Sequence, residues 1–455
     1  MEPELLVRLY NVGLGDCIYV RIPDQASERH VLIDCGNKFG KGADLERAIS
    51  HLEADLPAEP SGKKQLDLLV VSHPHEDHLK GFDTELFENF HIHRIWLSPS
   101  MNPTHPQAKG LRSVQSFADR ALSQLRSLPL GTKQVEIFES MFELNKKTAV
   151  AALLEGLPQA NGNIKPEYVH ANTPPGDLLA FNDGQIQLQV LGPMEDIDLF
   201  YLGKTAADVT SLRALGAVIS GLDVKDVAGA PSAAPTYPPN ISRSDFDQLR
   251  TRLLSNAIAF TLKSGELVNN TSIVLLLEWK GRRLLFPGDA QVKTSRAGKF
   301  EKGKSNGAWN VMWAMSKDAL NASLDFLKVG HHGSHNATPW TSKKVRVEEN
   351  GQEVEKPHPV NEILDAMLPE VDDPRKRKGR AIVSTRRTNA FEKIPDPELI
   401  ETLGKRVANV EQYTETPVHG VGVGANVDQP WRTDLKRDGS GKALPFLELR
   451  FKALT

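Results

Sequence analysis

Residues 70–81 read VVSHPHEDHLKG, and this stretch places three histidines and two acids within six consecutive positions, 73–78. It continues the run LDLLVV (66–71), which is almost continuously apolar, as expected for a strand buried on both faces. Three of the chain's 14 histidines in so few positions are more than a polar loop needs. The stretch therefore predicts metal ligands gathered where a buried strand ends.

The spacing of these ligands indicates two directions of coordination. His73 and His75 are two residues apart, so an extended backbone points both imidazoles to one side. Asp77 and His78 follow where the chain turns into a helix, and they aim elsewhere. This arrangement suits two metal ions side by side. Imidazole and carboxylate ligands favour zinc, manganese or iron over a metal that prefers thiolates.

Two later strands end in the same way. RRLLFPGDA (282–290) delivers Asp289 after an apolar run and a Pro-Gly turn, and DFLKVGHHGSH (325–335) delivers His331 and His332. Alone, the first would be an ordinary turn aspartate and the second an incidental histidine pair. Three apolar strands with metal-competent ends support one another.

Composition sets the broad class of the protein. The 455 residues are 40% apolar and 25% charged, as in soluble globular proteins, and the net charge of −3 excludes strong attraction of the whole chain to nucleic acid or membranes. The start, MEPELLVRLYNVG, does not resemble a secretory signal, and no apolar run approaches the roughly 20 residues that cross a bilayer. We expect Cys17 and Cys35 to be buried, reduced thiols, and the protein to be cytoplasmic.

The pattern along the chain predicts sheets packed together and covered by helices. Helical spacing is found at 44–56, 111–128, 142–157 and 396–406, and a loop or linker is expected at 227–240. The expected strands are 5–12, 16–22, 30–36, 66–73, 91–98, 186–193, 271–279, 282–286, 325–329, 380–385 and 445–451.

Together these segments resemble the metallo-β-lactamase fold, and most closely the soluble domain of ComEC-type competence proteins, which act in DNA uptake. The resemblance rests on the stretches NVGLGDCIYVRI, VLIDCG, SHPHEDHLKG, NNTSIVLLLEWKGRRLLFPGDA, LKVGHHGS, IVSTRR and KIPDPELIETL, in that order. It covers residues 5–100 and about 265–415. It implies an α/β fold, a four-layer αββα sandwich forming a single domain over 1–455. The region 100–265 has no counterpart and is expected to be a mainly helical insertion or lid.

The resemblance also implies roles for individual residues. His73 and His75 would hold one metal ion, Asp77 and His78 a second, and Asp289 would bridge the two. One member of the histidine pair would complete the second site, and we favour His332 over His331. Asp34 would orient a ligand through a hydrogen bond, with Asp16 in a similar supporting part.

The departure from the family concerns the first metal ion. Many relatives supply a third histidine from the middle of the chain, and here no motif marks one. His105 and His170 are candidates, although a loop position explains each better, and His91 and His93 on one face of a strand have a structural explanation. We expect two Zn²⁺ ions, with Mn²⁺ as the alternative and a single ion still open.

The predicted reaction is hydrolysis of an ester, most simply a phosphodiester. Two metal ions roughly 3.5–4 Å apart generate a hydroxide nucleophile near neutral pH, which Asp77 or Asp289 would orient as catalytic residues. The basic stretch 291–305, with Lys293, Arg296 and Lys299, would attract an anionic substrate such as nucleic acid, and 374–380 is basic too.

Two alternatives stay open. A small-molecule hydrolase would act on a phosphodiester headgroup, a cyclic nucleotide or a lactone beneath a lid formed by 100–265. A metal-binding subunit of a larger defence or DNA-processing assembly would instead dock a protein partner through that region.

Overall fold

The computed structural model describes residues 2–38, 42–108, 147–174, 178–202, 265–385, 394–408 and 446–454, with Ser242 and Ser244. The helix expected at 111–128 and the loop expected at 227–240 lie outside these residues. Among the described helices, none combines the length and the apolar character that crossing a membrane requires.

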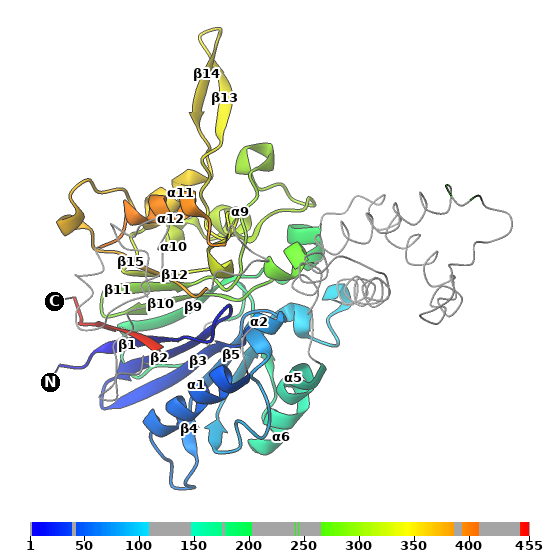
Figure 1. The fold of residues 1–455 in the computed structure, drawn as a ribbon, viewed down its shortest axis with the longest axis vertical. Helices are drawn as coiled ribbons and strands as arrows, with labels where there is room; N and C mark the ends of the chain where they lie inside the picture. The colour runs from blue at the N-terminus through cyan, green and yellow to red at the C-terminus, as the bar shows by residue number, and fades with distance from the viewer. Residues whose placement is uncertain are drawn as a thin grey trace.

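Six strands from the first half of the chain and one strand near its end, β16, form a seven-stranded sheet (Figure 1). Neighbouring strands are antiparallel from β16 through β1 and β2 to β3. They are parallel from β3 through β5 and β7 to β8. The order is β16 (Phe446–Phe451), β1 (Leu5–Tyr10), β2 (Cys17–Asp24), β3 (Ser27–Cys35), β5 (Leu68–Val71), β7 (Ile95–Leu97) and β8 (Glu167–Tyr168). Because β16 pairs with β1, the two ends of the chain lie side by side.

A second sheet of five strands packs on the first. Its strands β11, β12 and β15 are parallel, whereas β9, β10 and β11 are antiparallel. The order is β15 (Arg380–Val383), β12 (Phe326–Val329), β11 (Arg282–Phe286), β10 (Val274–Trp279) and β9 (Ile186–Gly192).

Alternate residues of the strands face different layers, which explains why these strands are apolar throughout. On β1, Leu5, Val7 and Leu9 lie in the core between the two sheets, while Leu6 and Tyr10 face the helices outside the first sheet. A third core lies between the second sheet and its own helices. Three stacked apolar layers define four layers of structure.

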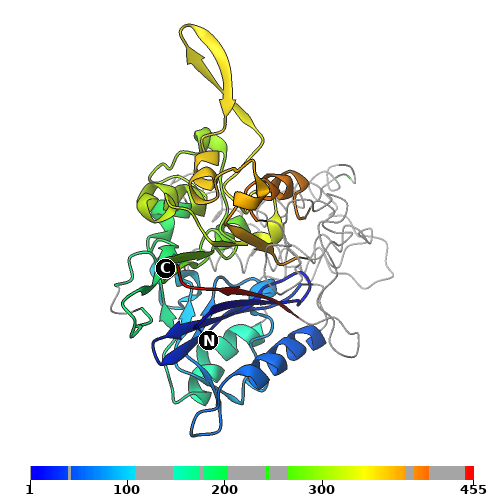
Figure 2. The same ribbon diagram turned by 90° about the vertical axis from the view of Figure 1, so that its left-hand side faces the viewer.

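Helices cover the outer face of each sheet (Figures 1 and 2). The first sheet is covered by α1 (Gly42–Asp55), α2 (Glu76–Leu79), α5 (Lys147–Ala151) and α6 (Leu157–Ala160). The second is covered by α9 (Ala308–Met315), α10 (Lys317–Leu320), α11 (Asn361–Met367) and α12 (Pro397–Gly404). The predicted αββα sandwich is therefore confirmed.

Residues 100–265 contribute to this sandwich where they are described. The strand β8 extends the first sheet, β9 forms an edge of the second, and α5 and α6 pack on the first sheet. An insertion or lid stays a prediction for the remainder of that region.

The single strand expected at 91–98 is wrong. The chain instead forms β6 (Phe90–Ile92), which pairs with β4 (Lys64–Leu66) in a separate two-stranded sheet, and then β7 in the main sheet. His93 donates its amide to the carbonyl of Leu66, and Arg94 accepts from Leu69, so the chain changes pairing partner between them. Pairing with two different neighbours is a tertiary effect that residue type does not encode.

A hairpin that the sequence did not predict projects from the second half of the fold (Figures 1 and 2). It joins β13 (Lys344–Glu349) to β14 (Gln352–Pro357) through Asn350 and Gly351, both at positive φ, the conformation of a tight two-residue turn.

The strands that end in histidine or aspartate finish at one edge of the sandwich. Because β11 and β12 are parallel neighbours, their carboxyl ends lie together. Ser72, which follows β5 in the other sheet, accepts a hydrogen bond from the amide of Ile273 at 2.9 Å. A Cβ on Gly288 would lie 2.9 Å from that of Ser72, so the two sheet ends touch there.

Gly36 controls how closely α2 approaches the first sheet. A Cβ at this position would lie 2.4 Å from both the carbonyl oxygen of Glu76 and the amide nitrogen of His78. We expect Gly36→Ala to lower the free energy of unfolding by about 1–3 kcal/mol, because backbone atoms must move. Urea unfolding measures this, with Gly184→Ala as the control, since a Cβ there meets no atom within 4 Å. Equal midpoints for the two variants would contradict the prediction.

Candidate metal centre

Six side chains from three strand ends converge at this edge. His73 and His75 follow β5, Asp77 and His78 lie on α2, Asp289 follows β11 and His332 follows β12. All are buried except His75, which is half-buried.

The local fold of 73–78 explains the two directions. His75 is extended (φ −91°, ψ 151°) and precedes the first turn of α2, in which the amide of His78 donates to the carbonyl of His75 at 3.0 Å. The Nε2 of His73 lies 2.9 Å from the Nδ1 of His75, so both imidazoles point to the same side as their spacing predicts. Asp77 and His78, on the helix, approach from another direction.

Asp34 fixes the imidazole of His78. The Nδ1 of His78 donates to Asp34 Oδ2 at 2.8 Å, and Asp34 also accepts from the amide and the hydroxyl of Ser72, each at 2.7 Å. This leaves the Nε2 of His78 facing Asp289 Oδ2 at 3.2 Å. A carboxylate that sets the tautomer of an imidazole in this way is the usual support of a histidine metal ligand.

His331 and His332 make different contacts. His332 donates from Nδ1 to the carbonyl of Ser384 at 2.8 Å, and its Nε2 lies 2.9 Å from Asp77 Oδ2. The ring of His331 instead contacts Ser334 at 2.8 Å, while its amide donates to Asp289 Oδ1 at 2.8 Å. Both residues have positive φ, which non-glycine residues adopt only when the surrounding structure holds them there. His332 thus faces the other ligands, and His331 positions Asp289.

The contacts between imidazoles and carboxylates require a cation. When the Nδ1 of His78 and of His332 donates, the Nε2 of each neutral ring presents a lone pair to a carboxylate oxygen. His78 Nε2 and Asp289 Oδ2 are both buried without a hydrogen-bond partner, which is costly unless a proton or a metal ion lies between them. Imidazole nitrogen and carboxylate oxygen are ligands of Zn²⁺ and Mn²⁺, so these residues fit a divalent metal.

The distances group the ligands differently from the prediction. His73, His78 and Asp289 form one set, and Asp77, His78 and His332 another, each with ligand atoms within 4.8 Å of one another. His78 belongs to both sets and His75 to neither. The predicted division, with His73 and His75 on one ion and Asp77 and His78 on the other, stays a prediction.

The electrostatics separate the histidines into two kinds. Burial, with charge on neighbouring imidazoles, holds the pKa of His73 well below the usual range, and burial lowers the pKa of His75 to about 3. For His78 burial acts in the same direction, but Asp289 and Asp34 outweigh it and raise its pKa well above the usual range. Asp77 likewise raises the pKa of His332 against the effect of burial.

Both candidate catalytic carboxyls stay ionised. Burial opposes ionisation of Asp77, yet the charge of Lys38 and the hydrogen bond with His332 bring its pKa well below the usual range. For Asp289, charge on His78 and His331 outweighs burial in the same way and lowers its pKa.

Three supporting residues were missed from the sequence. Lys328, buried on β12, forms an ion pair with Asp16, whose Oδ2 also lies 3.8 Å from His78 Nδ1. Lys38 acts on Asp77 and His75 by its charge, and Ser72 joins Asp34 to His73. The one available signal was Lys328, a lysine inside the otherwise apolar run FLKV.

The remaining candidates lie elsewhere or are paired. His105 Nδ1 accepts from the amide of Ala108 at 3.3 Å, and His170 Nε2 is 4.0 Å from Glu195. Neither His105 nor His170 joins a group of ligands among the described residues.

In the basic stretch 291–305, Lys293 pairs with Glu266 at 2.8 Å and Arg296 with Glu301 at 3.1 Å, whereas Lys299 is exposed. His91 and His93 contact Glu59.

Comparison with known families agrees with this geometry. Residues 10–113 match the family model of the metallo-beta-lactamase superfamily. The matched segment contains Asp16, Asp34 and the whole of 73–78, and the superfamily indicates a metal-dependent hydrolase, in agreement with the αββα fold and the donor set. A search of curated proteins found no match. The narrower likeness to ComEC-type proteins stays a prediction.

Lys328 compensates buried negative charge at the centre. We expect Lys328→Met to lower the free energy of unfolding by about 3–5 kcal/mol, because Asp16 would lose its buried partner. Adding Asp16→Asn should recover part of the loss in a double-mutant cycle measured by urea unfolding with chelator present. Lys343→Met serves as the control, since Lys343 is exposed and should change stability by less than about 0.5 kcal/mol. Additive effects of the two site substitutions would count against the pairing.

The two kinds of histidine predict the protons released on metal binding. At about pH 6.5 an ordinary histidine is half protonated, so the raised pKa values leave His78 and His332 mostly charged and the lowered ones leave His73 and His75 neutral. Zinc must displace protons from the first pair only. Its affinity should therefore rise with pH until that pair is neutral.

Calorimetry in two buffers of different ionisation enthalpy measures this release at about pH 6.5. His332→Gln should release fewer protons than the wild type. A binding heat that does not depend on the buffer would contradict the assignment.

Proposed function

We propose that the protein is a metal-dependent phosphodiesterase, acting most simply on nucleic acid. The observation that supports a metal-dependent hydrolase is the pair of buried carboxylates, Asp77 and Asp289, each with an oxygen facing the Nε2 of a buried imidazole, a contact that needs a proton or a metal ion between the two atoms. Bound metal ions would supply a nucleophilic water near neutral pH and neutralise charge on the substrate.

The chain's own residues provide the remaining parts. Asp77 and Asp289 are ionised at neutral pH because the pKa of each is lowered, so either carboxylate can orient a water by accepting a hydrogen bond from it. Asp289 is held by the amide of His331 and cannot rotate freely. Lys38 places positive charge beside Asp77 and His75, where an anionic group of a substrate would be stabilised.

The basic stretch 291–305 supports an anionic polymer as substrate. The stretch begins beside the metal centre, because the side-chain amide of Gln291 lies 3.3 Å from the ring of His331. Lys293 and Arg296 pair with acids, which reduces their value as phosphate ligands. Lys299, Lys302 and Lys304 are exposed and are the better candidates.

The second basic stretch, 374–380, gives weaker support. Arg377 is buried and donates to the carbonyls of Val371 and Gly404, each at 2.6 Å, and Arg375 pairs with Asp373. Arg377 therefore stabilises the fold. Arg386 and Arg387, two further basic residues that follow this stretch in the sequence, lie outside the described residues.

The first test is hydrolysis of bis-p-nitrophenyl phosphate and of single- and double-stranded DNA and RNA, with Zn²⁺ or Mn²⁺. We expect Asp77→Ala to lower kcat by about 100-fold or more, because the variant has no carboxylate at this position to orient water. The double variant His73→Ala, His75→Ala should lose activity together with the metal bound at the main centre. Glu85→Ala, which removes an exposed acid nearby, is the control. Full turnover by Asp77→Ala with metal bound would overturn its assignment.

The same assay separates a polymer substrate from a small one. Reversing the charge of Lys299, Lys302 and Lys304 together should weaken polymer cleavage and flatten its salt dependence, by about 0.9 in the logarithmic slope for each phosphate that these lysines no longer neutralise. Hydrolysis of the small diester should not change. If the wild type cleaves the small diester alone, the polymer proposal fails and a small-molecule hydrolase replaces it. If it holds metal and cleaves neither, a lactone substrate or a role within a larger assembly is favoured.

A further inference from the structure

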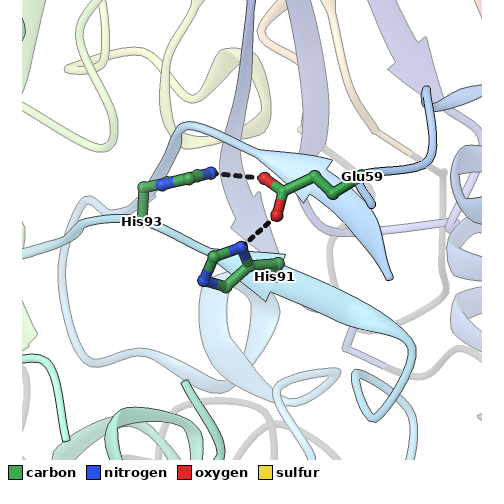
Figure 3. A group of neighbouring side chains, drawn as sticks. All are labelled: Glu59, His91 and His93. Atoms are coloured by element: carbon green, nitrogen blue, oxygen red, sulfur yellow. Dashed lines mark hydrogen bonds and ion pairs between the residues drawn. The ribbon is translucent and has the colours of Figure 1, made fainter. Parts of the chain in front are cut away.

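A second group of metal-competent side chains lies on the small β4–β6 sheet. Figure 3 shows Glu59, from the loop between α1 and β4, facing His91 on β6 and His93 just beyond it. Glu59 Oε2 is hydrogen-bonded to His91 Nδ1, and Glu59 Oε1 lies 2.7 Å from His93 Nε2. The ring centroids of the two histidines are 4.5 Å apart. None of these residues belongs to the metal centre at 73–78.

The backbone around this group is held in place before any ligand arrives. The amide of Glu59 donates to the carbonyl of Lys63, and that of Gly62 donates to the carbonyl of Glu59, each at 2.8 Å. On the other side, β6 pairs with β4, and the amide of His93 donates to Leu66 at 3.0 Å. Both segments that carry the three side chains are therefore fixed relative to each other, which lowers the cost of ordering them on binding.

The three donor atoms lie close to the arrangement that a zinc ion requires. They are all within 4.8 Å of one another, and tetrahedral Zn²⁺ with bonds near 2 Å needs about 3.3 Å between ligand atoms. Small side-chain rotations cover this difference. The side chains of His91 and His93 are 37% and 42% exposed, so each ring can move its proton to the other nitrogen while remaining solvated.

The charge of Glu59 suits the same role. Its slight burial opposes ionisation, but the hydrogen bonds and charges of His91 and His93 lower its pKa below the usual range. An ionised carboxylate between two imidazoles would neutralise half of the charge of a divalent ion. Metals of the later first transition series, Zn²⁺ among them, favour this mixture of nitrogen and oxygen ligands.

We propose that Glu59, His91 and His93 bind a divalent transition metal ion, Zn²⁺ in the first instance, separate from the metal centre at 73–78. One carboxylate oxygen and two imidazole nitrogens hold the ion, and a fourth position stays open to water. The ion ties the loop that carries Glu59 to β6. This site is independent of the proposed hydrolytic activity.

The test counts bound Zn²⁺ per chain by equilibrium dialysis for the wild type, His93→Ala and Glu59→Gln. We expect each variant to bind one ion fewer than the wild type and to lose part of the rise in Tm that Zn²⁺ produces. The matched control is Glu88→Gln, which removes the same charge from an exposed residue near β6 and should keep the full count. His93 is exposed, so His93→Ala should fold, and circular dichroism checks this.

Two further results separate the sites. The variant His73→Ala, His75→Ala should keep the ion at Glu59, visible as a Co²⁺ absorption spectrum that disappears when His93→Ala is added. Diester hydrolysis by His93→Ala should match that of the wild type. Equal Zn²⁺ counts and equal Tm shifts in the wild type, His93→Ala and Glu59→Gln would overturn the proposal, whatever the hydrolytic assay shows.

Discussion

Buried negative charge is the constraint on which this structure depends. Asp16, Asp34, Asp77 and Asp289 are each no more than 6% exposed, and they converge on one edge of the sandwich. Burying even one unpaired carboxylate costs several kcal/mol. Lys328 compensates Asp16, and the imidazole of His78 compensates Asp34, but the oxygens of Asp77 and Asp289 that face Nε2 atoms need a further positive charge. The arrangement is therefore stable only with protonated histidines or with bound metal, and this links folding, pH and metal at one place.

The sandwich brings these groups together by close backbone approach. Gly36 packs directly on the backbone of α2, and a Cβ on Gly330 would lie 2.4 Å from the carbonyl oxygen of Gly288. These contacts bring the helix that carries Asp77 and His78 against β3, and the end of β12 against the turn that carries Asp289. Three apolar cores hold the layers rigid, so the ligands need little reorganisation when metal binds.

The sequence predicted the parts of the site that depend on spacing and strand ends. The two-residue separation of His73 and His75 set a shared direction, and the turn into a helix placed Asp77 and His78 apart from them. It could not predict which ring faces which carboxylate, because that depends on strands from different sheets. The pairing of Lys328 with Asp16 joins residues 312 positions apart, and the division of 91–98 between β6 and β7 follows from competing neighbours. Local pattern contains neither kind of information.

The two groups of histidines differ in how deeply they are buried and in how their side chains are held. At the main centre burial opposes charge on imidazole and carboxylate alike, and some ligands are fixed by a second contact, such as that of Asp34 with His78 or of Ser384 with His332. Around Glu59, the imidazoles are partly exposed and the carboxylate itself is their shared hydrogen-bond partner. A metal ion there would replace hydrogen bonds that already satisfy the group, so its affinity must come from the ion's own ligand bonds. A metal ion at the main centre would instead supply the positive charge that the contacts between carboxylate oxygens and imidazole nitrogens need. The same types of ligand therefore make the fold depend on metal to different degrees. Metal binding at the edge of the two large sheets should affect the fold more than metal binding beside the small β4–β6 sheet.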